Sequence, residues 1–389
     1  MPPRSKKRVK QSPTPISNSE SEDAPAMDYA SLSSTNVTSR GFLALPGELV
    51  SQILSYFPEI KTVHTLMNPI FIGNWKNPDN YFERFDVLRA LSQLCRLSRQ
   101  IYLPLLWERF QACLTTNTKG QWYRSIGKSM ERKSQGMLKS KHLWPFVKVV
   151  TVTLTRFQTS KVLPPFMELL GVLPNVHTLE IPHTHPAMTT ALKVTFGGKI
   201  FPTIQKVILP TCAHEILRCC PEVREVICNE GDGGRLVGAL VYNECKKLEV
   251  LRGIYAAGPI LMKRLSAASP PLRCVSIPRG AGTDVIPAYA SFSSLRVIDI
   301  DCSEDTVADD YIKLAKDTLR ACAKYKPPKK GKGSRQKSAD DGLSDSCLAD
   351  LYSEPRMVRV MRFGKSFSRY HFSESSSLKI EKFPLEDLD

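Results

Sequence analysis

The chain has 389 residues, of which 42% are hydrophobic and 24% charged, and its formal net charge is +16. The apolar fraction excludes a wholly disordered chain, and the length exceeds what one compact core usually serves. No apolar run approaches the roughly 18 residues of a membrane span, and no signal-peptide core follows the start, so we expect no membrane partner. The eleven scattered cysteines predict free thiols in a reducing compartment.

Residues 1–40 are rich in Ser, Thr and Pro and hold few large apolar residues, which predicts a disordered tail. A basic cluster opens this tail, consisting of Arg4, Lys6, Lys7, Arg8 and Lys10. The cluster is either a nuclear-import address or a solvated basic end. The expected location is therefore the nucleus, the cytoplasm or both.

Residues 41–113 predict a small helical domain. Pro46 suits the first turn of a helix, and Glu48 adds a favourable negative charge there. An apolar stripe follows at helical spacing, made by Leu49, Val50, Ile53, Leu54 and Phe57. A second helix is expected from about Phe85, with Leu88, Leu91, Leu94 and Cys95 on one side, and Pro104 is expected to start a short third helix through Phe110.

These residues resemble an F-box. The matching pieces, in order, are Leu45-Pro46 with Glu48, then Leu91-Ser92 with Leu94-Cys95-Arg96, and finally Pro104 with Leu106-Trp107. The resemblance implies a three-helix unit that docks on the Skp-type adaptor of a cullin ubiquitin ligase. It implies adaptor-binding roles for Leu45, Pro46, Leu49, Ile53, Leu54, Leu91, Cys95 and Trp107. The departure from the family is an insertion at residues 58–84, and the alternative is an ordinary helical domain whose stripe packs only within the chain.

Residues 114–145 are strongly basic and interleave Trp122, Tyr123 and Trp144. Basic residues with aromatics can clamp single-stranded nucleic acid by phosphate pairing and base stacking. The simpler interpretation, which we prefer at this point, is a polar linker and solvated helix between two domains.

A degenerate pattern recurs over residues 146–320: an apolar residue, two variable positions, an apolar, one variable, an apolar. The copies are Val147/Val150/Val152, Val176/Leu179/Ile181, Ile204/Val207/Leu209, Val223/Val226/Cys228, Leu272/Val275/Ile277 and Leu295/Ile298/Ile300, with a weaker copy at Leu248/Leu251. The last apolar pair of each copy alternates as a half-buried strand does, and short helical stretches lie between copies. The pattern resembles degenerate leucine-rich repeats but lacks their usual Asn. The predicted fold class is α/β, with an irregular leucine-rich-repeat-like solenoid; the alternative is a non-repetitive α/β domain.

If the solenoid is right, the strand residues between the apolar ones point to its open face. The candidate substrate-binding residues are Thr178, Glu180, Lys206, Glu225, Arg252 and Asp299. Their mixed charge fits a protein-binding surface better than a phosphate-binding one. Joint replacement of Glu180, Glu225 and Arg252 is expected to weaken substrate capture without unfolding the chain.

The remaining C-terminal segments are predicted as a disordered insertion at 321–350, a last repeat at 351–366 and a polar end at 367–389. The last repeat is assigned to Val358/Met361/Phe363. Segments 1–10, 119–148 and 324–337 hold more than the whole net positive charge, so the rest of the chain is slightly acidic. Nucleic acid is therefore an unlikely main partner of the folded part.

Residues that carry catalysis or bind cofactors are not recognisable in the sequence. There is no CxxC pair, and His183 and His185 lack ligands at metal spacing. Gly127-Lys128-Ser129 lacks the rest of a phosphate loop, and no nucleophile elbow occurs. We expect no catalytic residue, metal or cofactor, and predict a non-catalytic receptor that links the ligase adaptor to an unknown protein substrate. The alternative is a basic nucleic-acid-binding or nuclear scaffold protein without ubiquitin function.

Overall fold

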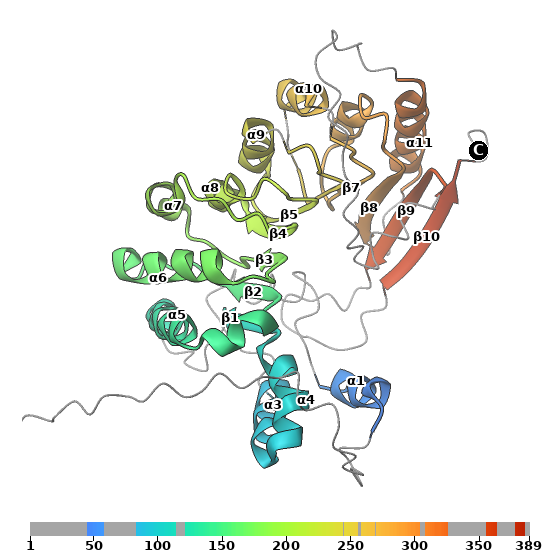
Figure 1. Ribbon diagram of the computed structural model, residues 1–389. Helices are drawn as coiled ribbons and strands as arrows, with labels where there is room; N and C mark the ends of the chain where they lie inside the picture. Colours follow the sequence, from blue (N-terminus) through green and yellow to red (C-terminus); the bar gives the residue numbers. More distant parts are fainter. Residues whose placement is uncertain are drawn as a thin grey trace, which may run out of the picture. The chain divides into compact units, whose positions relative to one another are not determined.

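The computed structural model describes residues 45–57, 83–113, 121–243, 245–255, 258–268, 270–303, 308–325, 355–363 and 378–385 (Figure 1). The predicted tail at 1–40, nearly all of the insertion at 58–84, and most of the insertion at 321–350 lie outside these residues. The described part is a mixed α/β structure with one large open sheet. In this part of the chain, no helix has the length and apolarity needed to cross a bilayer.

Ten strands form the sheet, and each pairs with the next one in the sequence. Pairing is parallel from β1 to β9, and only β10 runs antiparallel to its neighbour. The strands are β1 Arg109–Ala112, β2 Val149–Val152, β3 Thr178–Glu180, β4 Lys206–Pro210, β5 Glu225–Glu230, β6 Val250–Arg252, β7 Cys274–Ile277, β8 Val297–Ser303, β9 Met357–Phe363 and β10 Leu378–Pro384.

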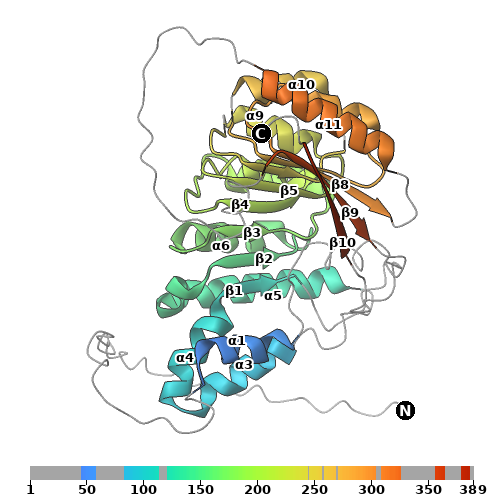
Figure 2. The same ribbon diagram turned by 90° about the vertical axis from the view of Figure 1, so that its right-hand side faces the viewer.

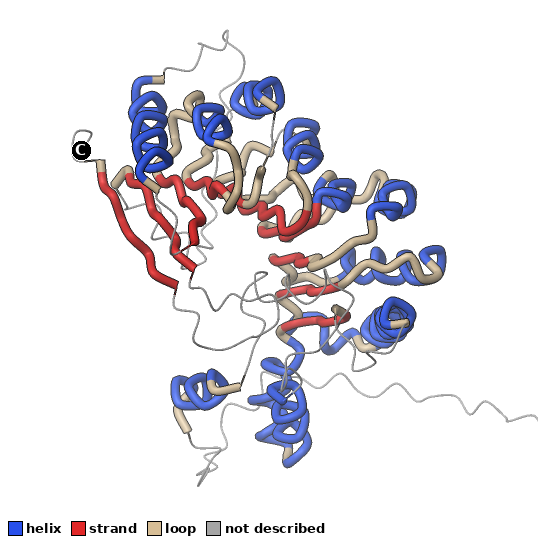
Figure 3. The backbone as a smooth tube through the Cα atoms, turned by 180° about the vertical axis from the view of Figure 1, so that it is seen from behind, coloured by secondary structure: helices blue, strands red, loops and turns tan. Residues whose placement is uncertain are grey.

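Helices or 3-10 turns connect the successive parallel strands, as parallel pairing requires a crossover. The α-helices are α1 Gly47–Ser55, α3 Glu83–Leu94, α4 Arg96–Trp107, α5 Trp122–Lys139, α6 Thr159–Val172, α7 Thr189–Phe196, α8 His214–Leu217, α9 Gly234–Tyr242, α10 Pro259–Ala267 and α11 Asp309–Lys324. The 3-10 helices are Lys141–Phe146, Pro186–Met188, Thr211–Ala213 and Thr283–Tyr289. Helices α5 to α11 lie along one face of the sheet (Figure 3); the opposite face is called the open face below.

One continuous core lies between the strands and these helices. It contains the second apolar residue of each predicted copy, including Val150, Leu179, Val207 and Ile298. These residues lie in one register row across the sheet, so each copy adds one layer to the same core. The period-two pattern of the sequence therefore correctly placed strands β2 to β8.

The first helices form as predicted, with one break. Val50 and Leu54 of α1 are buried, and Arg84 Nη1 donates a hydrogen bond to the Leu54 carbonyl at 3.2 Å. The second predicted helix is interrupted at Cys95, whose backbone is extended and whose Sγ accepts a hydrogen bond from Ser98 N at 3.4 Å. Cys95 thereby caps α4, and α3 and α4 are separate helices (Figure 2).

Two predictions near this region are wrong. Pro104 does not start a helix but lies inside α4, and the chain beyond Trp107 forms β1, the first strand of the sheet. The described part of the basic segment, 121–145, contains the expected helix, but this helix is not merely solvated: α5 buries Ile126, Met130 and Met137, and the latter two belong to the main core. The sequence did contain evidence for this packing, since apolar residues recur at helical spacing within 122–139 and form one apolar side of the helix.

The last predicted repeat, assigned to Val358/Met361/Phe363, is displaced by three residues. Val358 and Val360 point into the core, opposite Ile298 and Ile300 of β8. Met361 lies in the alternate row, opposite Asp301 and Ile380. Because side chains alternate along a strand, this displacement exchanges the two faces and puts Arg359 on the open face. The end at 367–389, predicted as merely polar, contributes β10.

Candidate functional site

The open face of the sheet is lined by rows of side chains that alternate with the core rows. One row runs through Thr178, Lys206, Glu225, Val250 and Cys274 on neighbouring strands. The other row runs through Glu180, Ile208, Ile227 and Arg252 and then through Ser276, Asp299 and Arg359. The strand residues chosen from the sequence as substrate-binding all occur in these rows.

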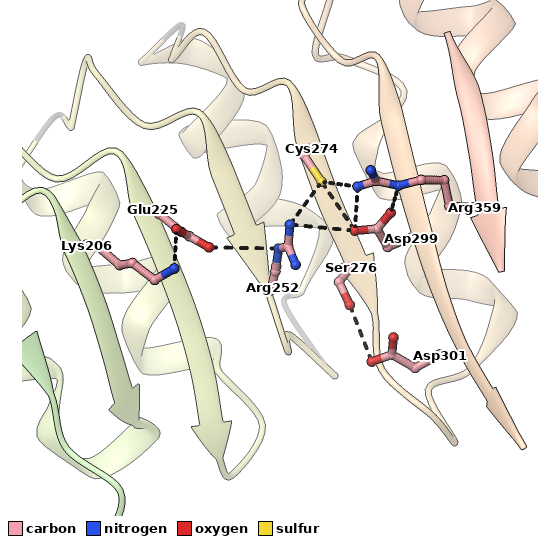
Figure 4. A network of polar contacts seen from close by, with 8 residues as sticks. All are labelled: Lys206, Glu225, Arg252, Cys274, Ser276, Asp299, Asp301 and Arg359. Carbon is pink, nitrogen blue, oxygen red and sulfur yellow. Dashed lines mark hydrogen bonds and ion pairs between the residues drawn. The ribbon is translucent and has the colours of Figure 1, made fainter. Parts of the chain in front are cut away.

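A chain of ion pairs crosses the C-terminal half of this face (Figure 4). Lys206 Nζ lies 2.8 Å from Glu225, whose other oxygen lies 4.0 Å from Arg252 Nε. Arg252 Nη2 lies 3.8 Å from Asp299, and Arg359 donates two hydrogen bonds to the same carboxylate at 2.7 and 3.1 Å. The charges thus alternate in sign over strands β4, β5, β6, β8 and β9.

Asp299 is the centre of this network. Its side chain is fully buried, with 0% exposure, and it receives the forked guanidinium of Arg359. The Cys274 thiol also lies near Asp299, with Sγ 3.5 Å from Oδ2. Burial, together with the adjacent Asp299 charge, raises the pKa of Cys274 to about 12. A buried carboxylate needs such partners because its desolvation alone is very costly.

Asp301 lies next on the same side of β8 and is less well satisfied. Ser276 Oγ donates to its Oδ2 at 3.5 Å, while Oδ1 is buried without a hydrogen-bond partner. Desolvation raises the pKa of Asp301 to about 6, and the charge of Asp299 contributes to the same rise. This carboxyl therefore titrates in a range that is accessible to experiment.

A second polar cluster occupies the N-terminal end of the open face. Arg109 of β1 lies 2.6 Å from Glu180 of β3, and Thr151 of the intervening strand donates to the same oxygen at 2.7 Å. Arg109 Nη1 also donates to Thr151 Oγ1 at 2.9 Å. The Glu180 carboxylate thus links strands β1, β2 and β3 through side-chain contacts.

These contacts change how the predicted substrate-binding residues are interpreted. Thr178, Glu180 and Asp299 are buried, whereas Lys206, Glu225 and Arg252 are half-buried. Replacement of Glu180 carries a structural cost in addition to any effect on substrate capture, because its removal leaves Arg109 without its carboxylate. The accessible part of the face is centred on Lys206, Arg252 and the half-buried Ile227.

The candidate adaptor-binding residues divide by exposure. Pro46, Leu49, Ile53 and Cys95 are exposed, and Leu45, Leu91 and Trp107 are half-buried. Leu54 is buried, and Trp107 packs against the main core, so these two side chains stabilise the fold. The structure thus distinguishes residues that are accessible to a partner from residues that pack within the fold, which the sequence pattern could not do.

Several relevant residues were not selected from the sequence. Tyr56, Phe85 and Leu94 are large exposed apolar residues in or beside α1 and α3. Arg109 and Arg359 were missed because their strands were respectively assigned to a helix and given the wrong register. The Val358-Arg359-Val360 alternation was the available evidence for the correct register of β9.

The histidines and cysteines of the described residues have other neighbours than a metal site would supply. Over these ranges, no three side chains of His, Cys, Asp and Glu gather as metal ligands would. His183 instead pairs with Glu230 at 2.9 Å, and His185 Nδ1 accepts a hydrogen bond from Ala187 N at 3.1 Å. The ten cysteines of the described part are free thiols, and burial raises the pKa of several of them.

Comparisons with known proteins find no match to this chain, either among protein-family models or among curated protein sequences. Any functional argument therefore depends on the residues and geometry described above.

Proposed function

We propose that this chain is the substrate-recognition subunit of a Skp-cullin-F-box ubiquitin ligase. In this proposal α1, α3 and α4 dock on the Skp-type adaptor, and the strand–helix units hold a protein target. The observation that carries the proposal is the exposure of Leu49 and Ile53, which are 43% and 38% accessible on a helix with the F-box-like opening.

The surrounding surface supports docking by the same helices. Tyr56, Phe85 and Leu94 are exposed as well, which gives this short region an unusual share of accessible large apolar side chains. Scattered apolar residues are common on protein surfaces, but several close together in sequence are characteristic of partner-binding sites. Cys95, which ends the LxxLSxLC piece, is exposed at the junction of α3 and α4.

The stacking of strands and helices supports the second half of the proposal. Each strand from β1 to β8 pairs in parallel with the next strand in the sequence, and intervening helices cover a shared core. This arrangement is typical of leucine-rich-repeat-like solenoids, in which each unit buries the apolar face of its neighbour. Such solenoids commonly bind proteins on the surface formed by their strands.

The mechanism requires no bond chemistry from this chain. A target held on the open face is brought near a ubiquitin-charged enzyme, and tethering raises the effective concentration of the reacting groups. Lys206 and Arg252 can pair with target carboxylates at the accessible part of the face, and Ile227 offers apolar contact. The mixed charges of the network set orientation more than affinity.

The proposal is tested by co-purification of the full chain with the Skp-type adaptor and cullin. Leu49→Asp with Ile53→Asp should abolish this association because it places two charges in an apolar interface. The matched control is Val194→Asp with Ile200→Asp, two residues even more exposed, at 79% and 69%, but distant in sequence. Retained association of the first variant, or no association of the parental chain, refutes the ligase role and leaves the scaffold alternative.

Target binding is tested separately on the open face. Lys206→Ala with Ile227→Ala should reduce the set of proteins ubiquitinated through this chain while adaptor binding persists. This pair avoids Glu180 and Asp299, whose loss would perturb the fold. An unchanged target set would exclude this part of the open face from recognition.

A further inference from the structure

The outward side of α5 carries a row of cations that the proposed function does not use. Arg124, Lys128, Arg132 and Lys139 are all exposed and follow one another at intervals of four, four and seven residues. Four residues of α-helix rise about 6 Å, so the row extends over roughly 22 Å. Gln121 and Gln135 lie on the same side, and the four cations are called the basic stripe below.

The orientation of this helix is fixed by its other side. Ile126, Met130 and Met137 are buried, and they lie about half a helical turn from the stripe. The stripe therefore faces solvent on the side of the sheet that carries the helices, away from the open face. A target held on the open face therefore does not compete for it.

The stripe lacks the neutralising partners that usually accompany surface cations. Among the ion pairs of the described residues, none involves these four side chains, and Arg124 lies over the Tyr123 ring at 6.0 Å. Glu131, the only acidic residue of α5, lies on the same side of the helix, three residues after Lys128, so the net charge of this side is +3. Like charges one turn apart cost about 0.2–0.5 kcal/mol each in a helix, and the Arg124–Lys128 and Lys128–Arg132 spacings incur this cost twice.

Another long amphipathic helix of the same layer, α11, has a more balanced charge than α5. Helix α11 has its own cations, but it also carries Asp309, Asp310 and Asp317. Arg320 pairs with Asp317 at 3.0 Å on its surface. The outer helices are thus not uniformly basic, and the excess positive charge of α5 forms no ion pair that would stabilise the fold.

The residue types of the stripe indicate the chemistry of its partner. None of the exposed large apolar residues in the described part of the chain lies on α5. Protein interfaces usually depend on buried aromatic or aliphatic anchors, whereas nucleic-acid backbones are held by Arg, Lys and polar side chains alone. We propose that the basic stripe binds the phosphate backbone of a nucleic acid. This inference revises the sequence-based view that nucleic acid is an unlikely partner.

The test uses the full chain and a labelled oligonucleotide, single-stranded or duplex, with anisotropy measured from 50 to 200 mM salt. The stripe variant joins Arg124→Gln, Lys128→Gln, Arg132→Gln and Lys139→Gln. Four phosphate contacts contribute a log–log salt slope of about −3.6 on duplex and about −2.8 on a single strand. The variant should lose a slope of this size, which corresponds to about 10²-fold in affinity over this salt range for duplex.

A second variant controls for net charge. Lys313→Gln, Lys316→Gln, Arg320→Gln and Lys324→Gln remove the same charge from α11 and should leave the slope nearly unchanged. Circular dichroism checks that both variants remain folded. Anionic vesicles and polyglutamate, used as competitors, should displace the oligonucleotide only weakly.

Four results would overturn the proposal. The first is that the parental chain binds no oligonucleotide. The second is that the stripe variant keeps the parental slope, which assigns binding to the other basic segments. The third is that the two variants lose equal slope, which assigns binding to net charge. The fourth is stronger stripe-dependent binding to vesicles or polyglutamate than to oligonucleotide, which excludes a nucleic acid as the partner. None of these results bears on adaptor co-purification, so the two proposals fail independently.

Discussion

Replacement of Asp299 by Asn tests whether the ion-pair network holds the open face together. Asn keeps the size of the side chain but removes the charge that Arg359 binds through two hydrogen bonds and that Arg252 approaches at 3.8 Å. Arg359 and Arg252 would then face each other without a carboxylate between them. The direct contacts of Asp299 are confined to β6, β7, β8 and β9, and the apolar core row stays intact.

The expected loss of stability is about 3 kcal/mol. Removal of one partner from a buried pair typically costs about 3–5 kcal/mol. The lower end applies because the side chains of Arg359 and Arg252 are 18% and 32% exposed and can partly rehydrate. In a single cooperative transition, this loss lowers the melting temperature by about 6–12 °C.

Alkylation of Cys274 provides a local assay. This thiol is fully buried beside Asp299, so it reacts only when β7 and β8 open. A loss of about 3 kcal/mol makes opening about 10²-fold more frequent. The variant also removes a charge that raises the pKa of Cys274, while the two arginines that lower it remain, so thiolate forms more readily.

Two controls separate this effect from general destabilisation. Cys245 is also buried with a pKa near 12, but it lies after α9, and its alkylation rate should change little. Asp317→Asn removes an exposed partner of Arg320 and should cost less than about 1 kcal/mol. If Asp299→Asn costs no more than Asp317→Asn, or if both thiols accelerate equally, the network does not stabilise the open face as argued.

Three further predictions follow from single positions. Asp301→Asn should stabilise the chain at pH 7.5 but not at pH 4. The parental carboxyl has a folded pKa of about 6 against an ordinary 3.8, so its favourable contribution to stability, complete below pH 3.8, is lost as the pH rises through 6. Urea midpoints of the two proteins that change in parallel with pH across this range would contradict the prediction. Gly253→Ala should lower the free energy of urea unfolding by at least about 2 kcal/mol, because φ is +73° and a Cβ would lie 2.0 Å from the Cys228 carbonyl oxygen. The control is Gly198→Ala, where φ is +75° but the space is open, and the loss should be about 1 kcal/mol. Glu180→Gln should destabilise the β1–β3 end of the sheet by about 2–3 kcal/mol, which would appear as faster amide hydrogen exchange in these strands. Unchanged exchange would show that the pairing of Arg109 with this carboxylate does not stabilise the sheet.

The open-face contacts show why part of the site escaped the sequence. Arg359 and Asp299 are 60 residues apart, and they meet only because β9 joins the sheet beside β8. No local pattern encodes that pairing, and a predicted register displaced by three residues placed Arg359 on the wrong face of the sheet. The solvent exposure of the predicted residues could not be inferred from the sequence either. Glu180, for example, is paired with Arg109 of β1, a strand that was predicted as a helix.

What the sequence determined by itself was the α/β class, the helical start and the successive strands β2 to β8. Period-two and period-3.6 apolar patterns are local, and each repeated unit must bury its apolar side against the next. The tertiary structure alone decided the two terminal strands, the packing of α5 into the core and the pairing of the buried charges. Those features depend on partners supplied by distant parts of the chain, because an edge strand, a packed helix and an ion pair acquire their stability only after the neighbouring layer is in place.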